Sequence, residues 1–75
     1  MSDTCQIDTR GLRCPLPVLK ARKALAGLPS GGMLTLWADD PIAVIDIPHF
    51  CTESGHSLID VQEHDGAQLY LIRRK

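Results

Sequence analysis

One cysteine is set apart from the other reactive side chains by the residues on either side of it. Cys14 lies in the run Arg10-Gly11-Leu12-Arg13-Cys14-Pro15-Leu16-Pro17, where a strand and its loop give way to a predicted helix. A helix start leaves backbone N–H groups unpaired and carries a partial positive charge, and both favour a nearby anion. Because Arg10 and Arg13 are close in sequence, we expect a lowered pKa for the Cys14 thiol and a nucleophilic thiolate near neutral pH.

Two prolines fix the position of this sulfur. Pro15 and Pro17 each lack a backbone N–H, stiffen the turn and are compatible with the first turn of a helix. A free cysteine is often a small buried apolar residue. Cys14, however, interrupts the apolar periodicity, follows an arginine and precedes a proline. We therefore favour an exposed sulfur that other proteins can reach.

The other sulfur and imidazole groups are expected to be structural. Cys5 is in phase with Ile7 in a strand pattern, which predicts a thiol on the core side, and Cys51 belongs to an apolar stretch of a helix. A zinc site would draw on Cys51, His49, His56 and His64, but their spacing matches no compact Cys or His pair. We expect no metal.

Asp39 and Asp40, followed by Pro41, have two interpretations. They could form a paired-carboxylate acid/base site, or one of them could accept hydrogen bonds from N–H groups at a helix start. We prefer the second. If both strand-to-helix turns lie at the same edge of the sheet, one of these carboxylates is near Cys14. The sequence has no glycine-rich phosphate loop, so we expect no cofactor.

Alternating and helical patterns predict the elements that position these residues. Strands are expected at 5–9, 33–38, 58–64 and 68–73, the last two joined by a hairpin turn at Asp65-Gly66. One helix follows Pro15 and runs to about Leu28. A second is expected from about Ile47 to Ser54, with Asp46 as its cap, Pro48 in its first turn and Gly55 after its end. The prediction is a single α+β domain over residues 1–75.

The first helix has a predicted core face and a predicted docking face. At 100° per residue, the core face holds Pro17, Val18, Ala21, Ala24, Leu25 and Leu28. Leu16 and Leu19 fall on the opposite side, near Lys20 and Lys23. With Arg13, these four residues form a candidate surface for a protein partner, unless the helix is rotated so that Leu19 is buried.

Composition and charge exclude several classes of protein. The chain has 75 residues, three cysteines, few aromatic side chains and a net charge of −1, which argues against nucleic-acid binding through the bulk field. Met1–Lys23 carries five basic and two acidic side chains, whereas Asp39–Asp65 carries seven acidic ones and no lysine or arginine. No stretch matches a membrane span or a secretory signal, so we expect a cytoplasmic monomer with reduced thiols.

The motif Cys14-Pro15-Leu16-Pro17, after its strand and loop, resembles the mark of the TusA/SirA family of small sulfur-carrier proteins. The resemblance covers nearly the whole chain, including Arg22-Lys23-Ala24-Leu25, Asp39-Asp40-Pro41, the segment from Asp46-Ile47-Pro48 to Cys51, and Gly55-His56. It implies a two-layer sandwich with the order β-α-β-α-β-β, a mixed four-stranded sheet and two helices on one face.

The resemblance also implies a function for Cys14, with Pro15 and Pro17 as its structural support. Cys14 would accept sulfane sulfur as a persulfide and pass it on, so that the protein acts as a sulfurtransferase-like carrier through this cysteine persulfide. Donors in the family include cysteine desulfurases and rhodanese-like proteins, and acceptors include DsrE-type proteins, in relays toward tRNA 2-thiouridine or in sulfur oxidation. The alternatives are a thiol redox protein, which lacks a resolving cysteine near Cys14, and a regulatory interaction module contacting RNA through its basic face.

Overall fold

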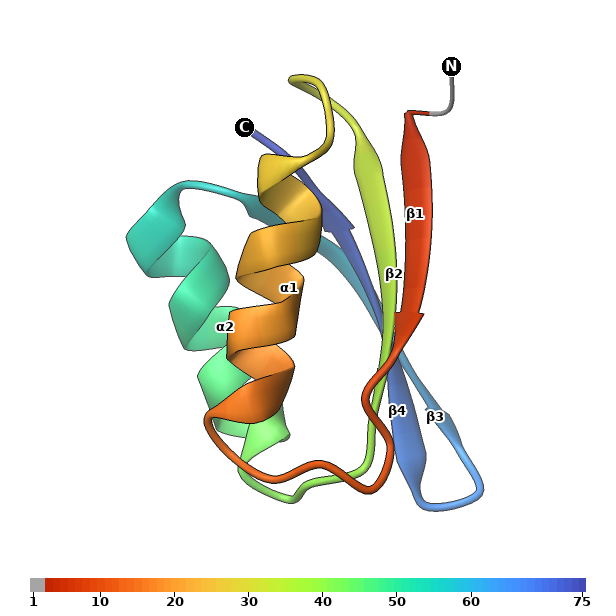
Figure 1. Ribbon diagram of the computed structural model, residues 1–75. Helices are drawn as coiled ribbons and strands as arrows, with labels where there is room; N and C mark the ends of the chain where they lie inside the picture. The colour runs from red at the N-terminus through yellow and green to blue at the C-terminus, as the bar shows by residue number, and fades with distance from the viewer. Residues whose placement is uncertain (1–2) are drawn as a thin grey trace.

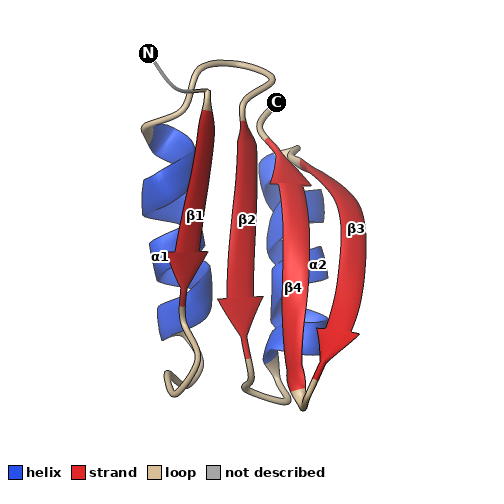
Figure 2. Cartoon of the chain, turned by 90° about the vertical axis from the view of Figure 1, so that its right-hand side faces the viewer, coloured by secondary structure: helices blue, strands red, loops and turns tan. Residues whose placement is uncertain are grey.

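A computed structural model describes residues 3–75, so the first two residues of the predicted domain lie outside the described residues. Its elements are β1 (Thr4–Asp8), α1 (Leu16–Ala26), β2 (Met33–Ala38), α2 (Ala43–Ser54), β3 (Ser57–His64) and β4 (Ala67–Arg73). The strands form one sheet in the order β1-β2-β4-β3, with β1 parallel to β2 and the other neighbours antiparallel. Both helices lie on one face of this sheet (Figure 1), and the opposite face is open in the view of Figure 2. The predicted fold class and element order are confirmed.

The core lies between the helices and the two central strands. Burial alternates along β2, where Leu34 and Leu36 point toward the helices and are fully buried. The register places Leu34 opposite Ile72 and Leu36 opposite Tyr70, so β4 contributes to the same apolar layer. Removing these side chains from water is the main force that holds the helices on the sheet.

The β3–β4 hairpin follows the prediction from its turn residues. Asp65 has φ 51° and Gly66 has φ 84°, and positive φ at both central positions is the geometry that favours Asp-Gly in a two-residue turn. Pairing begins directly at the turn, with His64 opposite Ala67. The pairing register shifts between Leu58 and Asp60, as at a β-bulge, near the other end of the edge strand β3.

Helix α1 buries the face that the periodicity predicts. Pro17, Ala21 and Leu25 are buried, and Leu28 is buried just beyond the helix, which ends at Ala26 rather than at Leu28. Leu19 is 47% exposed, so the alternative of a rotated helix is wrong.

Helix α2 begins at Ala43, four residues before the predicted start, and Asp46 is not its cap. A carboxylate oxygen of Asp40 accepts a hydrogen bond from the N–H of Ile42 at 3.2 Å, and the main-chain oxygen of Asp40 accepts one from Ala43 at 2.9 Å. These bonds start the helix early, so Pro48 lies inside it. A proline removes the bond to the carbonyl four residues earlier, which here belongs to the exposed Val44, where water can replace it.

Candidate functional site

The two loops that lead into α1 and α2 run side by side at one end of the sheet (Figure 1). Because β1 and β2 are parallel, their carboxyl ends meet at the same edge. The fully buried Thr9 extends this pairing beyond β1, since its N–H and its hydroxyl both donate to the main-chain oxygen of Trp37, at 2.8 and 2.6 Å. The expectation that both strand-to-helix turns lie at one edge is confirmed.

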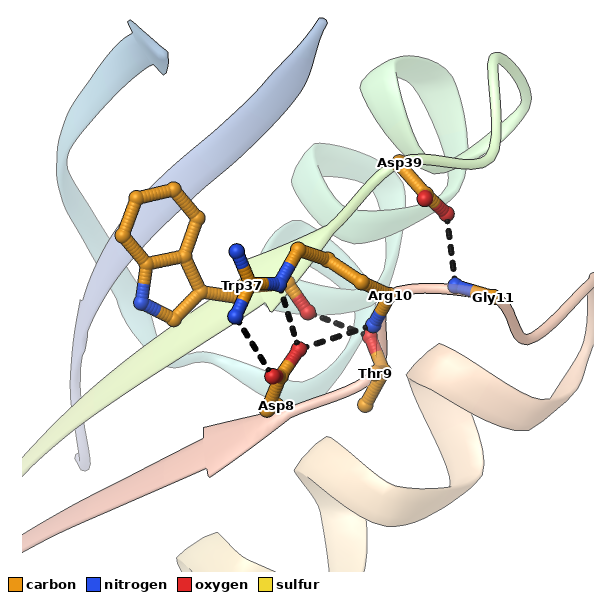
Figure 3. A network of polar contacts seen from close by, with 6 residues as sticks. All are labelled: Asp8, Thr9, Arg10, Gly11, Trp37 and Asp39. Carbon is orange, nitrogen blue, oxygen red and sulfur yellow. Dashed lines mark hydrogen bonds and ion pairs between the residues drawn. The ribbon is translucent and has the colours of Figure 1, made fainter. Parts of the chain in front are cut away.

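Two aspartates tie the first loop to the second. The N–H of Gly11 donates to Asp39 Oδ1 at 2.9 Å, as Figure 3 shows, and the N–H of Cys14 donates to Asp40 Oδ2 at 2.7 Å. Asp40 is only 4% exposed and also receives the N–H of Ile42. Both carboxylates therefore hold backbone N–H groups, and the bond from Ile42 at the start of α2 is the structural role that was predicted.

The side chain of Cys14 is exposed, and its thiol donates to Asp46 Oδ2 with a sulfur–oxygen distance of 2.7 Å. This hydrogen bond raises the pKa of the Cys14 thiol above its ordinary value, and desolvation and the negative charges of Asp46 and Asp40 act in the same direction. A thiolate here would face carboxylates instead of cations. The predicted lowering of the Cys14 pKa is wrong.

Arg10, one of the two arginines expected to lower the pKa of Cys14, is bonded to a different residue. Arg10 donates through Nε and Nη2 to the carboxylate of Asp8, at 2.9 and 2.7 Å, and its guanidinium lies 5.0 Å from the centre of the Trp37 ring (Figure 3). These bonds hold the pKa of Asp8 at about 2. Arg13 is exposed, and within residues 3–75 its guanidinium forms no hydrogen bond or ion pair.

The start of α1 also offers the sulfur fewer free backbone N–H donors than the sequence pattern predicts. Pro15 precedes α1 and Pro17 is at its second position, so two backbone donors are missing there. The N–H of Leu16 is bonded to the main-chain oxygen of Arg13 at 2.8 Å. The first turn therefore offers few free donors to an anion at Cys14.

The thiol lies at the surface, between the starts of the two helices. Its immediate neighbours are Pro17, Val18, Asp40, Ala43 and Asp46, which leave no space for a ligand. A groove of about 340 Å³ continues between α1 and α2 past the same carboxylate. The sulfur is therefore accessible from solvent where the starts of the two helices meet.

The predicted docking residues all belong to the loop before α1 or to α1 itself. Leu16 and Leu19 are 43% and 47% exposed, and Arg13, Lys20 and Lys23 are exposed as well. Lys20 and Lys23 also line a groove of about 720 Å³ between α1 and the edge strand β1.

The sequence reasoning missed a group of residues on the α2 side of the sulfur. Asp46 contacts the thiol, and the neighbouring Ile42, Val44 and Ile45 are large apolar residues that remain exposed. The available clue was the parallel arrangement of the first two strands, which places the first turn of the second helix beside Cys14. The second helix was expected to start at about Ile47, so Asp46 was expected to be its cap and not a neighbour of Cys14.

The other two cysteines lie where they were predicted. Cys51 is 2% exposed within the core, and burial raises the pKa of its thiol, while Cys5 packs partly buried against the same core. All three cysteines are free thiols. Across the described part of the chain, no three His, Cys, Asp or Glu side chains are grouped so as to hold a metal ion.

Comparison with known proteins shows to which family the chain is related. The family model described as sulfurtransferase TusA matches residues 5–74. The chain belongs to the TusA family. It is 44% identical to the sulfur carrier protein TusA of Pseudomonas fluorescens, over 91% of this chain and 82% of that protein. It is equally identical to TusA of Pseudomonas aeruginosa, over 92% and 87%.

A solved structure supports the same assignment at the level of the fold. A SirA-like protein from Desulfitobacterium hafniense superposes with a TM-score of 0.83 at 32% identity, covering 92% of this chain and 95% of that one. The family assignment therefore agrees with the fold as well as with the motif around Cys14.

Proposed function

We propose that this protein is a sulfur carrier that accepts sulfane sulfur as a persulfide on Cys14 and passes it to an acceptor protein. The observation that carries the proposal is the exposed Cys14 thiol at the sheet edge, in the Cys-Pro-x-Pro motif of a chain whose TusA relatives are named sulfur carriers. Pro15 and Pro17 support the sulfur by shaping the turn on which it lies.

The reaction is an exchange between sulfur atoms. The Cys14 thiol loses its proton, and the thiolate attacks the terminal sulfur of a donor persulfide. A bond forms between Cys14 Sγ and that sulfur, the donor's S–S bond breaks, and the donor thiolate leaves and takes up a proton. An acceptor thiolate then repeats the attack on the Cys14 persulfide. No external oxidant or reductant is consumed.

A carrier needs a protein that supplies sulfur and one that takes it. We infer a cysteine desulfurase or a rhodanese-like protein as the donor and a DsrE-like protein as the acceptor, in tRNA 2-thiouridine formation or in sulfur oxidation, with no direct contact to nucleic acid. Three free thiols fit a reducing compartment, and we propose a cytoplasmic monomer in which residues 1–75 act as one domain. Neither helix among the described residues has the length and apolar character to cross a membrane.

We also propose that partners dock beside the sulfur on the surface formed by Arg13, Leu16, Leu19, Lys20 and Lys23. The exposed leucines supply apolar contact area, and the cations favour an acidic partner surface.

A relay of labelled sulfur tests the function. A rhodanese is charged with thiosulfate that carries the label in its sulfane sulfur, the carrier is added and then purified, and an acceptor thiol is supplied. We expect the label to move to this protein and then to the acceptor, and to be released by reductant. A protein that instead loses two hydrogens and takes up no label would be a thiol redox protein, and the carrier proposal would be wrong.

A further inference from the structure

Two carboxylates are bonded to Cys14, Asp40 to its backbone N–H and Asp46 to its sulfur. We refer to Asp40 and Asp46 as the acidic centre. Asp40 is buried and its oxygens receive the backbone N–H groups of Cys14 and Ile42. Asp46 is half-buried, and within residues 3–75 the Cys14 thiol is its one side-chain donor. Within the described residues, the Asp46 side chain is therefore contacted by one neutral donor, the thiol, and by no cation.

The basic side chains that share a groove with Asp46 contact other residues. Arg22 and His49 line the groove that Asp46 shares. The Arg22 guanidinium lies 5.5 Å from the centre of the Phe50 ring, and His49 Nε2 is 3.8 Å from a carboxylate oxygen of Glu53. Among the described residues, no lysine, arginine or histidine forms an ion pair with Asp46.

The acidic centre is flanked by exposed apolar side chains, which we call the apolar rim. Ile42 and Ile45 precede Asp46 at the start of α2 and are 47% and 68% exposed, and Leu16 begins α1 two residues after Cys14. A protein that packs on this rim excludes water from Asp46. An unpaired carboxylate is costly to desolvate, so a partner that covers the rim must supply an opposite charge.

We propose that Asp46 is a positioning residue that holds Cys14 as a thiol in the free carrier, and that proteins exchanging sulfur with Cys14 place a lysine or arginine against Asp46. The inference rests on the proposed function and specifies the chemistry of the partner surface. The cation would pair with the carboxylate and draw it away from the thiol hydrogen bond.

The consequence for the exchange follows from acid strength. In the free carrier little thiolate is present, because the thiol is hydrogen-bonded to a carboxylate, so stray electrophiles react slowly. Once a cation pairs with Asp46, the thiol loses its proton and the thiolate attacks the donor's terminal sulfur; the donor's S–S bond breaks, and the departing donor thiolate takes up a proton. The same cation favours Cys14 as a leaving thiolate when the acceptor attacks the loaded persulfide, since a more acidic thiol leaves faster.

The test uses small reagents, so that it does not depend on any sulfur transfer. In a Cys5→Ser/Cys51→Ser background, Cys14 is treated with neutral, cationic and anionic methanethiosulfonates between pH 6 and 10. Asp46→Asn is compared with Glu53→Gln, which removes a carboxylate from the same helix and the same groove but does not touch the thiol.

We expect Asp46→Asn to react with the neutral reagent about threefold faster or more at pH 7, with its rate midpoint moved to lower pH. We also expect the ratio of the cationic to the anionic rate to fall about fivefold, because the attracting charge is gone. Glu53→Gln should match the parent in both measurements.

An unchanged pH midpoint in Asp46→Asn would overturn the role of Asp46 in holding the proton. A shifted midpoint with an unchanged ratio of the cationic to the anionic rate would overturn the proposal that partners place a cation against Asp46. If the variants behave as expected but labelled sulfur never enters the protein, the proposed function fails while the role of Asp46 stands.

Discussion

Arg10 is four residues from Cys14 in the sequence, yet its guanidinium is bonded to Asp8 and stacked over Trp37 (Figure 3). Asp46 is 32 residues away and touches the sulfur. The position of Cys14 was predictable, because the residue types around it mark a loop that enters a helix. Its electrostatic surroundings were not, because the partner of each charged side chain depends on which loops the fold brings together.

This arrangement predicts that removing the Arg10 guanidinium leaves the reactivity of Cys14 unchanged. In Arg10→Gln, we expect the pKa of Asp8 to rise from about 2 toward 3.8, since its guanidinium donor is lost. An NMR titration of the Asp8 carboxyl measures this, and the alkylation rate of Cys14 should match the parent protein.

The lowered pKa of Asp8 also makes the stability of the fold depend on pH in the acidic range. A carboxyl with a lowered pKa in the folded state stabilises the fold above its unfolded pKa, and the contribution is lost as pH falls from 3.8 to about 2. Arg10→Gln should remove this part of the acid dependence. Two results would contradict the account: a parent protein whose Asp8 titrates near 3.8, or an Arg10→Gln variant in which Cys14 is alkylated more slowly than in the parent.

At the scale of elements, strands and their order followed from alternation and turn residues, whereas the start of α2 did not. Both residues of the Asp65-Gly66 turn take the positive φ that the dipeptide predicts. For α2, the proline rule favoured a start near Pro48. The N–H groups of Ile42 and Ala43 instead donate to Asp40, and the exposed residue Val44 lets water replace the bond lost at Pro48, so the helix starts earlier. Asp40 combines the two tasks of starting α2 and holding the backbone of Cys14.

The turn between α1 and β2 depends on one glycine that lacks space. A Cβ on Gly32 would lie 2.9 Å from the main-chain oxygen of Pro29 and 3.0 Å from that of Asp3, and backbone atoms cannot move aside. We expect Gly32→Ala to lower the free energy of unfolding by about 1–3 kcal/mol, measured by urea denaturation.

Gly27→Ala is the matched control for that change. Gly27 has φ −87°, and a Cβ there meets its nearest atom at an ordinary 3.6 Å. This variant should keep the parent stability or gain up to about 1 kcal/mol. Equal losses in the two variants would show that the crowding at Gly32 does not matter.

On the scale of the whole molecule, a near-neutral total conceals two unlike surfaces around one sulfur. The basic side follows α1, and the acidic side lies at the start of α2, within a segment of seven acidic residues and no lysine or arginine. The parallel strands β1 and β2 bring both helix starts to the same edge (Figure 1). Cys14 lies between residues of these two starts, Pro17 of α1 and Ala43 and Asp46 of α2. The sequence predicted the basic docking side from helical periodicity alone. The position of the acidic side next to Cys14 becomes visible only in the tertiary structure.

The basic docking surface predicts a loss of transfer without a loss of structure. We expect Leu16→Asp or Lys23→Glu to leave the circular dichroism spectrum and thermal midpoint intact, and to lower kcat/KM for sulfur transfer from a charged rhodanese by roughly fivefold or more. Ile59→Asp is the matched control, because Ile59 is an equally exposed apolar residue on β3. Parent kinetics in both docking variants would contradict the proposed surface.

The central claim is that one sulfur atom carries the cargo, and intact-mass measurement of matched cysteine variants tests it most directly. Cys5→Ser/Cys51→Ser retains only Cys14, and Cys14→Ser retains only the two core thiols. After incubation with thiosulfate and a rhodanese, the first variant should gain the mass of one sulfur atom or a few, removable by reductant, and the second should gain none. An equal gain in Cys14→Ser, or no gain in the variant that retains Cys14, would contradict the account.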